Sequence, residues 1–553
     1  MVSNKQKSDD AIFQECIQFH QSGDFEKAQK GFEYLISKYP GSADLCNSLG
    51  TVYLQIGNDK KGCSLLEKSL QINPNQPMIC FNLGNSYLNQ KNLPKALEFY
   101  TATISKAPEY LEAYIKKGEL LTKLKIHNEA IDCLKSALKI APENLRILNS
   151  IGVNLLEIGQ AKVALEYFNQ CIKIDKTNAI LYNNAGLAAY KMNSFNESID
   201  YFNLCIKNAP ATGYFYSNRG LSFQALKNLN LAMEDFNKCI SLDPEYAESY
   251  WNKSLLHLFQ GNYKNGWELY EYRWQSFAKE WVRDYPNKLW LGNDSLKDKV
   301  IFIYPEQGHG DFIQCYRYIA LLKDLNPKKI ILEVTEPFNK LICSQDNEIE
   351  VIGTNNQPSK FDFYCPIMSL PLAFKTEILN VPNKCPYLLT NPNKDKFWEE
   401  KFKNNNRLRI GLCWSGNPLH KNNHNRSMSL DDFTELISLP FEFYSLQKDV
   451  PQKDLDILNK SKIIDLKSSL TNFSDTASLV KKMDFVVSVD SVIAHLAGAL
   501  DKKTFLLLPD KSSFLWMKDR KDSPWYPSIK IFRQSTLGEW DKPIKELICE
   551  LKT

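Results

Sequence analysis

The chain has 553 residues, of which 43% are hydrophobic and 24% are charged, and its formal net charge is +4 at pH 7. This length exceeds one ordinary hydrophobic core, so two or more globular domains are expected. The small net charge argues against a nucleic-acid partner. We expect a cytoplasmic protein without a transmembrane segment, because no apolar run approaches the roughly 20 residues of a spanning helix and the N-terminus lacks a hydrophobic leader.

The N-terminal half repeats with a period of 34 residues, marked by Pro40, Pro74, Pro108, Pro142, Pro210 and Pro244. A glycine, a small residue and a bulky residue recur in the same register. A small residue facing a bulky one lets two antiparallel helices approach closely, and a proline ends each pair. Cys171, Cys205 and Cys239 share this register and are predicted to be packing residues, which agrees with the absence of any C-x-x-C pair. The pattern is typical of tetratricopeptide (TPR) repeats, and eight registers fit between about residues 7 and 278.

Asparagines recur two residues before the repeated glycine, at Asn82, Asn184, Asn218 and Asn252. A stacked array of helical hairpins presents a groove, and an amide side chain can both donate to and accept from a peptide backbone. The repeated amides therefore predict a groove for an extended protein or peptide partner. The alternative is that asparagine simply suits this position of the repeat.

After an aromatic connector at 279–298, short apolar runs alternate with helical stretches, which predicts parallel sheets with crossover helices. The predicted strands are 300–305, 329–334, 349–353, 409–416, 441–447, 462–466, 485–490, 504–509 and 529–534. We expect an α-solenoid followed by two Rossmann-like lobes, at 299–390 and 407–553, with a connector and helix at 391–406. Ligands should bind beyond the carboxyl ends of the strands.

The loop EQGHGDF at 306–312 follows the first predicted strand. Gly308 and Gly310 would let the backbone and a small ligand approach each other. Ile313 stands where a dinucleotide fingerprint requires glycine, which excludes that kind of cofactor site. Asp311 is predicted to lie at the start of a helix, where it is either a helix cap or a catalytic carboxylate.

A second loop lies within FVVSVDSVIAHLAGAL at 485–500, where a predicted strand runs straight into a helix. Asp490 and Ser491 stand at the junction, and His495 follows one turn later. The N-terminus of such a helix offers unpaired N–H groups and positive partial charge, which suits a diphosphate. His495 is either a ligand contact or a half-buried histidine with a structural partner.

A third loop, WSGNPLHKNNHNRSMSL at 414–430, contains Ser415, Asn417, Lys421 and Arg426. Lys421 or Arg426 could neutralise a phosphate, and the alternative is a solvated basic loop. The two histidines of this loop lack both a helix and a partner carboxylate, so no metal site is predicted.

Taken in order, EQGHGDFIQCYRY, GLCWSGNP, NRSMSL, YSLQKD, DTASLVKKMDFVVSVDS and DSPWYPSIKIFRQ resemble the heptosyltransferase-like glycosyltransferases of GT-B fold. The whole chain resembles bacterial proteins that join a TPR array to such a domain. The resemblance implies transfer of a hexosyl or heptosyl unit from a nucleotide-diphosphate donor to an acceptor hydroxyl or amide, with no metal or other cofactor. It implies a general base at Asp311 and donor contacts at Ser415, Asn417, Lys421, Arg426, Gln447, Asp490, Ser491 and His495.

By analogy with the eukaryotic O-linked N-acetylglucosamine transferase, the repeats would recruit a protein acceptor. Two alternatives remain at this stage. One is a TPR scaffold whose C-terminal domain keeps the fold without the reaction. The other is a saccharide transferase of cell-envelope polysaccharide synthesis.

Overall fold

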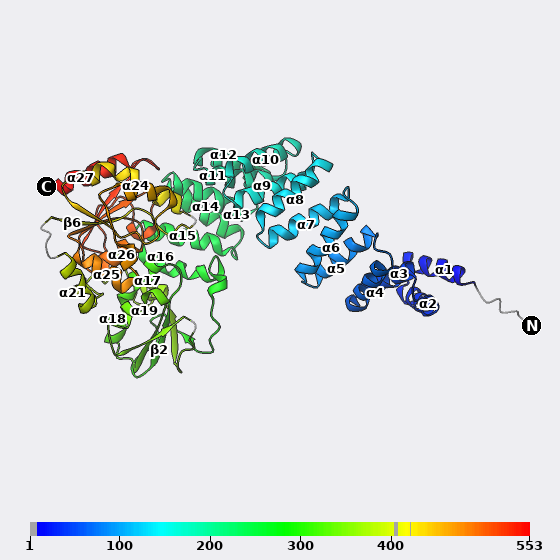
Figure 1. Ribbon diagram of the computed structural model, residues 1–553, viewed down its shortest axis with the longest axis horizontal. Helices are drawn as coiled ribbons and strands as arrows, with labels where there is room; N and C mark the ends of the chain where they lie inside the picture. Colours follow the sequence, from blue (N-terminus) through cyan, green and yellow to red (C-terminus); the bar gives the residue numbers. More distant parts are fainter. Residues whose placement is uncertain (1–7, 355, 403–406, 421, 553) are drawn as a thin grey trace, which may run out of the picture. The chain divides into compact units, whose positions relative to one another are not determined.

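The structure, a computed structural model, describes residues 8–354, 356–402, 407–420 and 422–552. Its internal contacts divide the chain into two compact units, Met1–Ser222 and Phe223–Thr553, and the division falls inside a helix of the repeat region. The first unit is helical throughout its described part (Figure 1). The second unit contains the remaining repeat helices and both β-sheets.

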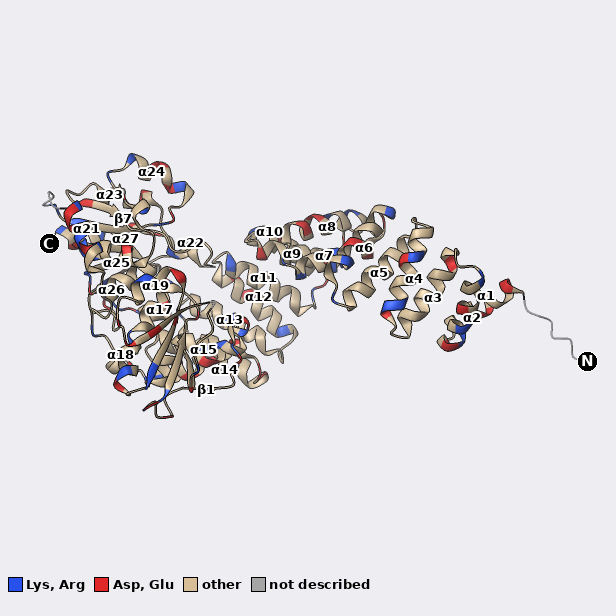
Figure 2. Ribbon diagram, turned by 60° about the horizontal axis from the view of Figure 1, so that its bottom comes forward, with Lys and Arg blue, Asp and Glu red and all other residues tan. Residues whose placement is uncertain are grey.

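The repeat region forms antiparallel helix pairs, as its 34-residue period predicted. The helices are α1 Asp9–Gln21, α2 Phe25–Lys38, α3 Ala43–Gln55, α4 Asp59–Ile72, α5 Pro77–Asn89, α6 Leu93–Lys106, α7 Leu111–Lys123, α8 His127–Ile140, α9 Leu145–Glu157, α10 Ala161–Ile174, α11 Ala179–Lys191, α12 Phe195–Asn208, α13 Gly213–Ala225, α14 Leu229–Leu242, α15 Ala247–Phe259 and α16 Tyr263–Tyr270. Lys, Arg, Asp and Glu are interspersed along these helices (Figure 2).

Close helix contacts explain the repeated glycines of this region. A Cβ atom on Gly152 would lie 2.5 Å from Cε1 of Phe168, and one on Gly84 would lie 2.6 Å from Cε1 of Tyr100. Each bulky ring is buried against the glycine of the preceding helix. Only a residue without a side chain leaves room for the ring, so the repeated glycine and the repeated bulky residue pack directly against each other.

The turns inside the helix pairs share a left-handed residue, which recurs at a spacing of 34 residues. These residues are Gly23, Gly57, Lys91, Lys125, Gly159, Asn193, Lys227 and Gly261. Glycine adopts a positive φ without steric cost, whereas lysine and asparagine do so at some expense. The backbone therefore keeps the repeat even where the residue type has changed.

The 14 cysteines are all free thiols, and most of them are packed in the interior. Burial raises the pKa of Cys171 to about 11 and that of Cys205 to about 12. Such thiols remain protonated and unreactive near neutral pH. Cys343 and Cys549 differ from the others because they are exposed.

Two parallel sheets follow the repeats. The first has the order β1-β5-β2-β3-β4, and the second has the order β11-β10-β9-β6-β7-β8. The strands are β1 Lys288–Leu289, β2 Val300–Tyr304, β3 Lys329–Val334, β4 Ile349–Gly353, β5 Phe363–Pro366, β6 Arg409–Cys413, β7 Glu442–Ser445, β8 Ile464–Asp465, β9 Phe485–Val489, β10 Thr504–Leu508 and β11 Ile529–Arg533. Every pairing between these strands is parallel, as in Val300↔Lys329 and Ile410↔Phe485.

The α-helices associated with the sheets are mostly short. They are α17 His309–Tyr316, α18 Tyr318–Asp324, α19 Glu336–Ile342, α20 Leu370–Ala373, α21 Pro392–Lys401, α22 Asn423–Arg426, α23 Thr434–Ile437, α24 Leu455–Lys460, α25 Phe473–Lys482, α26 Val492–Ala499 and α27 Asp541–Lys552. All the strands expected from the sequence are present. Two more were not expected: β5, and the two-residue β1 within the aromatic connector. The fold class is therefore as predicted, a helical repeat array followed by parallel α/β structure.

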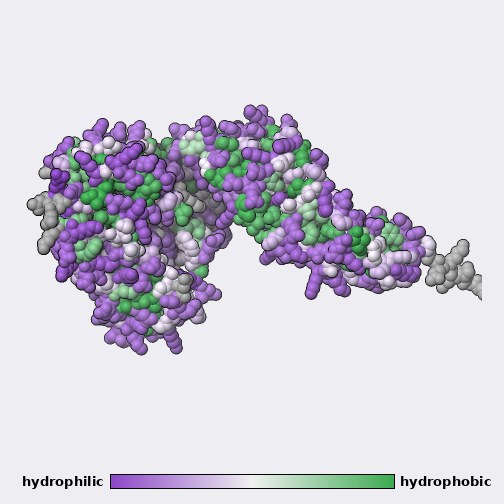
Figure 3. Space-filling model, viewed as in Figure 1, coloured by the Kyte–Doolittle hydropathy of each residue, from purple (hydrophilic) through white to green (hydrophobic). Residues whose placement is uncertain are grey.

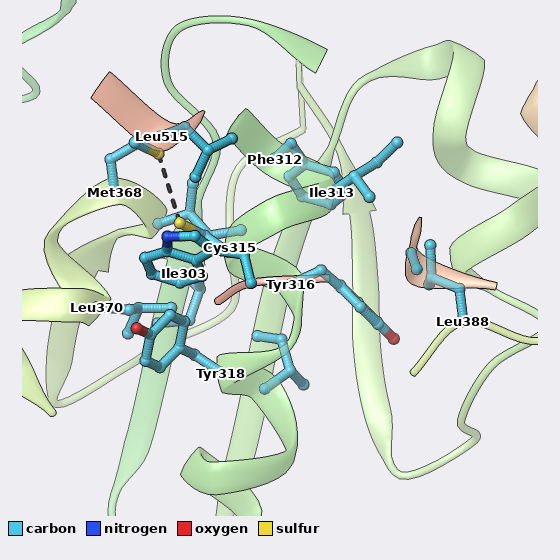
Figure 4. Packing of buried hydrophobic residues seen from close by; sticks show 14 of the residues in the cluster. Ile303, Phe312, Ile313, Cys315, Tyr316, Tyr318, Met368, Leu370, Leu388 and Leu515 are labelled. Atoms are coloured by element: carbon cyan, nitrogen blue, oxygen red, sulfur yellow. Dashed lines mark hydrogen bonds between the residues drawn. The ribbon is translucent and has the colours of Figure 1, made fainter. Parts of the chain in front are cut away.

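One hydrophobic cluster runs through the second unit. It joins Tyr270 of the last repeat helix to Ile303 of β2, Phe312 of α17, and Leu496 and Leu506 of the second-sheet region. Figure 4 shows part of this cluster, including the contact of the Cys315 sulfur with that of Met368 at 3.5 Å. Because both sheets share this core with the last repeat helices, these parts support one another.

The surface agrees with this distribution of apolar residues. On the face seen in Figure 3, hydrophilic residues predominate and hydrophobic residues form separate patches. Within the described ranges, no helix combines the length and the apolar character that crossing a bilayer requires.

Candidate functional site

The strand orders mark two places where a parallel sheet can bind a ligand. Ligands bind beyond the carboxyl ends of two neighbouring strands at which the strand order reverses. In the second sheet this point lies between β6 and β9, because β7 and β10 lie on opposite sides of that pair. In the first sheet it lies between β2 and β5, because β3 and β5 lie on opposite sides of β2. The loops after β2, β6 and β9 contain the motifs singled out in the sequence.

The loop after β2 places Asp311 in the first turn of α17. Its Oδ2 atom accepts a hydrogen bond of 2.9 Å from the backbone N–H of Gly308, which is the N-cap of the helix. Burial raises the pKa of Asp311 from 3.8 to about 6; Asp490 and Glu306 raise it further, whereas Gly308 and Arg426 lower it. Asp311 is therefore a helix-capping carboxylate with the proton affinity of a general base that works near neutral pH.

His495 of α26 lies directly against this loop. A Cβ atom on Gly310 would be 2.7 Å from Cδ2 and 2.9 Å from Nε2 of His495. The absence of a side chain at Gly310 is thus what allows α17 and α26 to meet. The first turn of α17, which holds Asp311, and the ring of His495 consequently belong to one site.

His495 is neutral in this site. Burial lowers its pKa from 6.5 to about 4, although Asp490 acts in the opposite direction. Nδ1 lies 2.9 Å from the hydroxyl of Tyr526, whose pKa is raised well above its usual value by burial. Tyr526 keeps its proton and can donate it to Nδ1, and in that tautomer the proton of the imidazole is on Nε2. Nε2 of His495 then presents an N–H donor toward the loop of Gly310.

Asp490 and Ser491 follow β9, and their side chains have different partners. Oδ1 of Asp490 accepts a hydrogen bond of 2.9 Å from Nε1 of Trp516. The hydroxyl of Ser491 caps α26 through the N–H of Ile493 at 3.3 Å, and it lies 3.0 Å from the hydroxyl of Ser488. Ser491 thus connects β9 to α26. The Asp490 carboxylate is held in place close enough to Asp311 to raise the pKa of that residue.

The loop after β6 is supported from within by polar side chains. Oε1 of Gln447 accepts from the backbone N–H of Ser415 at 3.1 Å, and its Nε2 donates to the carbonyl of Asp449 at 3.0 Å. The hydroxyl of Ser427 accepts from the N–H of Gly416 at 3.0 Å. Ser415 and Gln447 are both buried, so they shape the loop.

The remaining predicted residues of this loop differ in position. Asn417 is exposed and its side chain accepts from the N–H of Leu419 at 3.0 Å, which closes a turn. Lys421 lies outside the described residues. Arg426 packs across Gly416, where a Cβ atom would be 2.8 Å from its Nε. This buried Nε has no hydrogen-bond partner among the described residues.

Arg426 supplies positive charge to the site. It lowers the pKa of both Asp311 and His495. A buried guanidinium nitrogen without a partner is costly. The structure thus brings together Asp311, Asp490, His495 and Arg426, with α26 directing its N-terminus to the same loops.

Sequence reasoning missed several residues that build this arrangement. Tyr526 and Trp516 fix His495 and Asp490. Arg317 is buried below α17 and donates to the carbonyl oxygens of Pro382 at 3.0 Å and Trp525 at 2.5 Å. No local sequence signal predicts these contacts, because each joins segments far apart in the chain.

The asparagines of the repeats form hydrogen-bonded contacts between neighbouring repeats. Nδ2 of Asn184 donates to Oδ1 of Asn149 at 2.9 Å, and Nδ2 of Asn218 donates to Oδ1 of Asn183 at 2.8 Å. Asn183 and Asn184 are themselves joined at 3.3 Å. The amides thus form a ladder that includes residues of a second register.

The other two predicted asparagines lie elsewhere in the repeats, Asn82 on α5 and Asn252 on α15. Within the described residues, no group of three or more His, Cys, Asp or Glu side chains is arranged to hold a metal ion. A cavity of about 160 Å³ borders Tyr263 and Ile378, and another of about 570 Å³ borders Lys503 and Lys530. Neither of these cavities is lined by a predicted site residue.

Models of two protein families match parts of this chain. A model of glycosyltransferase family 9 (heptosyltransferase) matches residues 462–539, which include Asp490, Ser491 and His495. Tetratricopeptide-repeat models match residues 43–76, 81–144, 145–178, 179–212 and 214–246. The chain therefore carries TPR repeats in its N-terminal region and a glycosyltransferase family 9 domain near its C-terminus, and the resemblance drawn from the sequence is confirmed.

The individual proteins that match this chain do so at low sequence identity. Protein FlbA of Caulobacter vibrioides is 22% identical over 329 residues, which is 54% of this chain and 54% of FlbA. The chain thus spans about half the length of this curated relative. Among solved structures, YrrB, described as a TPR protein with an unusual peptide-binding site, is 21% identical with a TM-score of 0.31, and the match covers 34% of this chain and 98% of YrrB. A TPR protein from Parabacteroides merdae is 19% identical with a TM-score of 0.32, covering 45% and 98%.

Proposed function

We propose that the protein is a glycosyltransferase of GT-B type that moves a sugar from a nucleotide-diphosphate donor to an acceptor hydroxyl or amide. The observation that carries this proposal is the contact between Gly310 and His495, because it unites the Asp311 loop with the helix matched by the glycosyltransferase family 9 model. Two parallel sheets with reversal points at β2 and at β6 and β9 support the GT-B assignment.

In the proposed reaction, Asp311 is the general base. The acceptor oxygen or nitrogen attacks the anomeric carbon, its proton passes to the Asp311 carboxylate, and the bond from the anomeric carbon to the diphosphate oxygen breaks. The diphosphate leaves with that electron pair. A pKa of about 6 leaves the carboxylate ionised at neutral pH and still basic enough to accept a proton. Such general-base catalysis contributes on the order of a hundred- to ten-thousandfold.

The second-sheet residues would stabilise the leaving group. Helix α26 is eight residues long, and its N-terminus offers backbone N–H groups and positive partial charge. Arg426 adds a positively charged guanidinium, and Nε2 of the neutral His495 can add an N–H donor. Donors held in place before the reaction stabilise charge that builds up as the diphosphate departs. The Asp490 carboxylate, fixed by Trp516, is suited to accept hydrogen bonds from sugar hydroxyls.

We further propose that transfer needs no metal, since Arg426 and the α26 amides would neutralise the diphosphate themselves. The proposed donor site is completed by Ser415, Asn417, Lys421, Gln447 and Ser491. The buried residues Ser415, Gln447 and Ser491 would contribute by shaping the loops. Transfer assays with nucleotide sugar in the presence and absence of a chelator test this, because a metal-dependent transferase would lose its activity when the chelator is added.

The repeat array would recruit the acceptor, for which we propose a protein or peptide. Asn82, Asn184, Asn218 and Asn252 remain the proposed contacts. Amides that already bond to one another, as Asn184 and Asn218 do, are held in fixed orientations. Each of these amides can still donate and accept further hydrogen bonds with the backbone of a bound peptide.

A panel of nucleotide sugars tests the proposal. The full-length protein is first screened by thermal shift, since a ligand that binds only the folded state raises the apparent stability. The stabilising donor is then incubated with protein and peptide acceptors, with saccharide acceptors in parallel, and the products are analysed by mass spectrometry. Donor binding with transfer that is lost in Asp311→Asn supports the enzyme. Absence of donor binding across the panel would favour the scaffold alternative, and transfer to saccharides alone would favour envelope polysaccharide synthesis.

A further inference from the structure

Side chains at the end of the repeat array form hydrogen bonds with the loop that carries Asp311. The contact begins at Tyr270, the last residue of α16, and continues in the short 3-10 helix η1, Glu271–Gln275. Arg273 of η1 is fully buried, and its Nε and Nη2 donate in parallel to the two carboxylate oxygens of Glu306, each at 2.8 Å. Glu306 is the second residue after β2 and lies immediately before the glycine-rich turn.

All five N–H donors of Arg273 are used. Nη1 donates to Oε1 of Glu271 at 2.6 Å and to the carbonyl of Tyr270 at 3.2 Å, and the second N–H of Nη2 donates to the hydroxyl of Ser369 at 2.7 Å. Oε1 of Glu306 also accepts from the backbone N–H of Met368, which follows β5. The planar guanidinium therefore fixes the loops after β2 and β5 at the reversal point of the first sheet.

Gln307 shows why this loop needs external support. Its φ of +60° places it in the left-handed region, which is unfavourable for a residue with a side chain. The hydroxyl of Tyr270 bonds to the side-chain amide of Gln307, at 3.2 Å from Oε1 and 3.0 Å from Nε2. Strained backbone conformations persist only where their surroundings determine them, and they concentrate at functional sites. Here Tyr270 holds the Gln307 side chain, and Arg273 holds the preceding residue, Glu306.

The strained turn leads directly to the catalytic carboxylate. The next residue, Gly308, donates its backbone N–H to Asp311 and opens α17. We propose that Arg273, together with Tyr270, is a positioning residue that holds the turn 306–308 and so places the Asp311 carboxylate for transfer. The last helix of the repeats is then part of the catalytic apparatus. This inference rests on the proposed function for its kinetic consequences.

The charges around Asp311 make this arrangement measurable. Glu306 and Asp490 raise its pKa and Arg426 lowers it, while His495, Tyr270 and Cys315 are neutral neighbours. In Glu306→Gln, one negative charge near Asp311 is removed and the positive charge of Arg273 is less compensated. Both changes favour the ionised carboxylate, so the pH midpoint of kcat/KM, which reports the free enzyme, should move below about 6.

The test compares Arg273→Lys with Arg283→Lys. Arg283 also holds a buried glutamate through two bonds, to Glu333 at 2.5 and 2.8 Å, and its guanidinium stacks on the ring of Tyr304, but within the described part of the chain it has no hydrogen bond to residues 305–311. Hydrogen exchange of the peptides covering residues 305–313, which begin after Tyr304, is measured by mass spectrometry on the full chain. We expect roughly ten- to hundredfold faster exchange in Arg273→Lys, as for loss of one charge-assisted hydrogen bond, and no change there in Arg283→Lys.

Kinetics provide the second readout. In Arg273→Lys, kcat should fall roughly a hundredfold with an unchanged donor KM, because misplacement of a catalytic group affects the chemical step. Tyr270→Phe removes only the bond to Gln307 and should show the same pattern to a smaller extent; it decides the question if Arg273→Lys does not fold. An exchange rate in residues 305–313 equal to that of the wild type would overturn the proposal if it is found in Arg273→Lys, or in Tyr270→Phe where Arg273→Lys does not fold. If the wild type transfers no sugar, the proposed function fails, and the exchange data alone then decide whether Arg273 holds the turn.

Discussion

Replacing Asp311 with asparagine is expected to stabilise the protein at neutral pH while abolishing transfer. The pKa of Asp311 is raised from 3.8 to about 6, which corresponds to about 3 kcal/mol of unfavourable free energy on the folded, ionised state at pH 7.5. Asparagine carries no charge and can still accept the hydrogen bond from Gly308. The variant should therefore unfold at a temperature about 4 °C higher, given the unfolding entropy of a unit of roughly 330 residues.

The sign of the pH dependence follows from the same pKa. Because the folded state binds a proton more tightly than the unfolded state, wild-type stability contributed by Asp311 is lost as the pH rises from about 4 to about 6. The advantage of the asparagine variant should thus shrink to about 1 kcal/mol at pH 4.5. His495 acts in reverse, since its pKa is lowered to about 4, and its contribution is lost as the pH falls below about 6.5. The two slopes offset each other in the wild type.

Thermal unfolding of Asp311→Asn, wild type and His495→Gln at pH 7.5 and 4.5 measures both effects. Asp432→Asn is the matched comparison, because Asp432 likewise accepts from the N–H three residues earlier, that of Ser429 at 2.8 Å, and burial also raises its pKa. Since Asp432 is not part of the site, this variant should gain stability at pH 7.5 without losing transfer. A wild-type or lower melting temperature for Asp311→Asn at pH 7.5 would refute the reasoning. It would mean that the carboxylate is well solvated or paired and has no raised pKa.

Three further predictions concern residues around the site and in the repeats. Gly310→Ala should destabilise the protein by about 1–3 kcal/mol in chemical denaturation, because its Cβ would overlap the ring of His495, whereas Gly41→Ala, with open space around it, should be neutral. Arg426→Met should weaken binding of a nucleoside diphosphate about tenfold in calorimetry, and unchanged affinity would remove this residue from the proposed donor site. It should also raise the pH midpoint of kcat/KM, since the guanidinium lowers the pKa of Asp311. Asn184→Ala should lower stability by about 1 kcal/mol through its lost inter-repeat bond and weaken peptide capture measured by fluorescence anisotropy, and full capture would show that the amide ladder is structural only.

The fold could be predicted from sequence wherever a period or an alternation was long enough. The 34-residue register located the helix pairs, and buried runs such as 329–334 and 349–353 coincide with β3 and β4. β5 was missed because Phe363–Pro366 is short, ends in proline and follows a polar stretch, so only its pairing with β2 defines it. β1 has two residues and likewise depends on its neighbour.

The site could be predicted only as a set of loops. Parallel strands bring their carboxyl ends to one edge of a sheet, so the order of strands and loops along the chain is enough to assign Asp311 and His495 to ligand-binding edges. The sequence could not indicate that the side-chain amide of Gln447 bonds within the chain, because a glutamine amide supports a loop and binds a ligand equally well. It also could not reveal Arg273, whose partner lies 33 residues away and whose role exists only in the folded core.

The uneven exposure of the thiols offers a direct way to observe the second unit in solution. Cys343, just beyond α19, and Cys549, on α27, are both exposed, and they belong to the first-sheet and second-sheet regions respectively. Maleimide dyes or spin labels would react there first, because burial keeps thiols such as Cys205 protonated and shielded. The native chain thus already contains a pair of attachment points whose separation, read by energy transfer or dipolar spectroscopy, would report any movement between the two sheets when a nucleotide sugar is added.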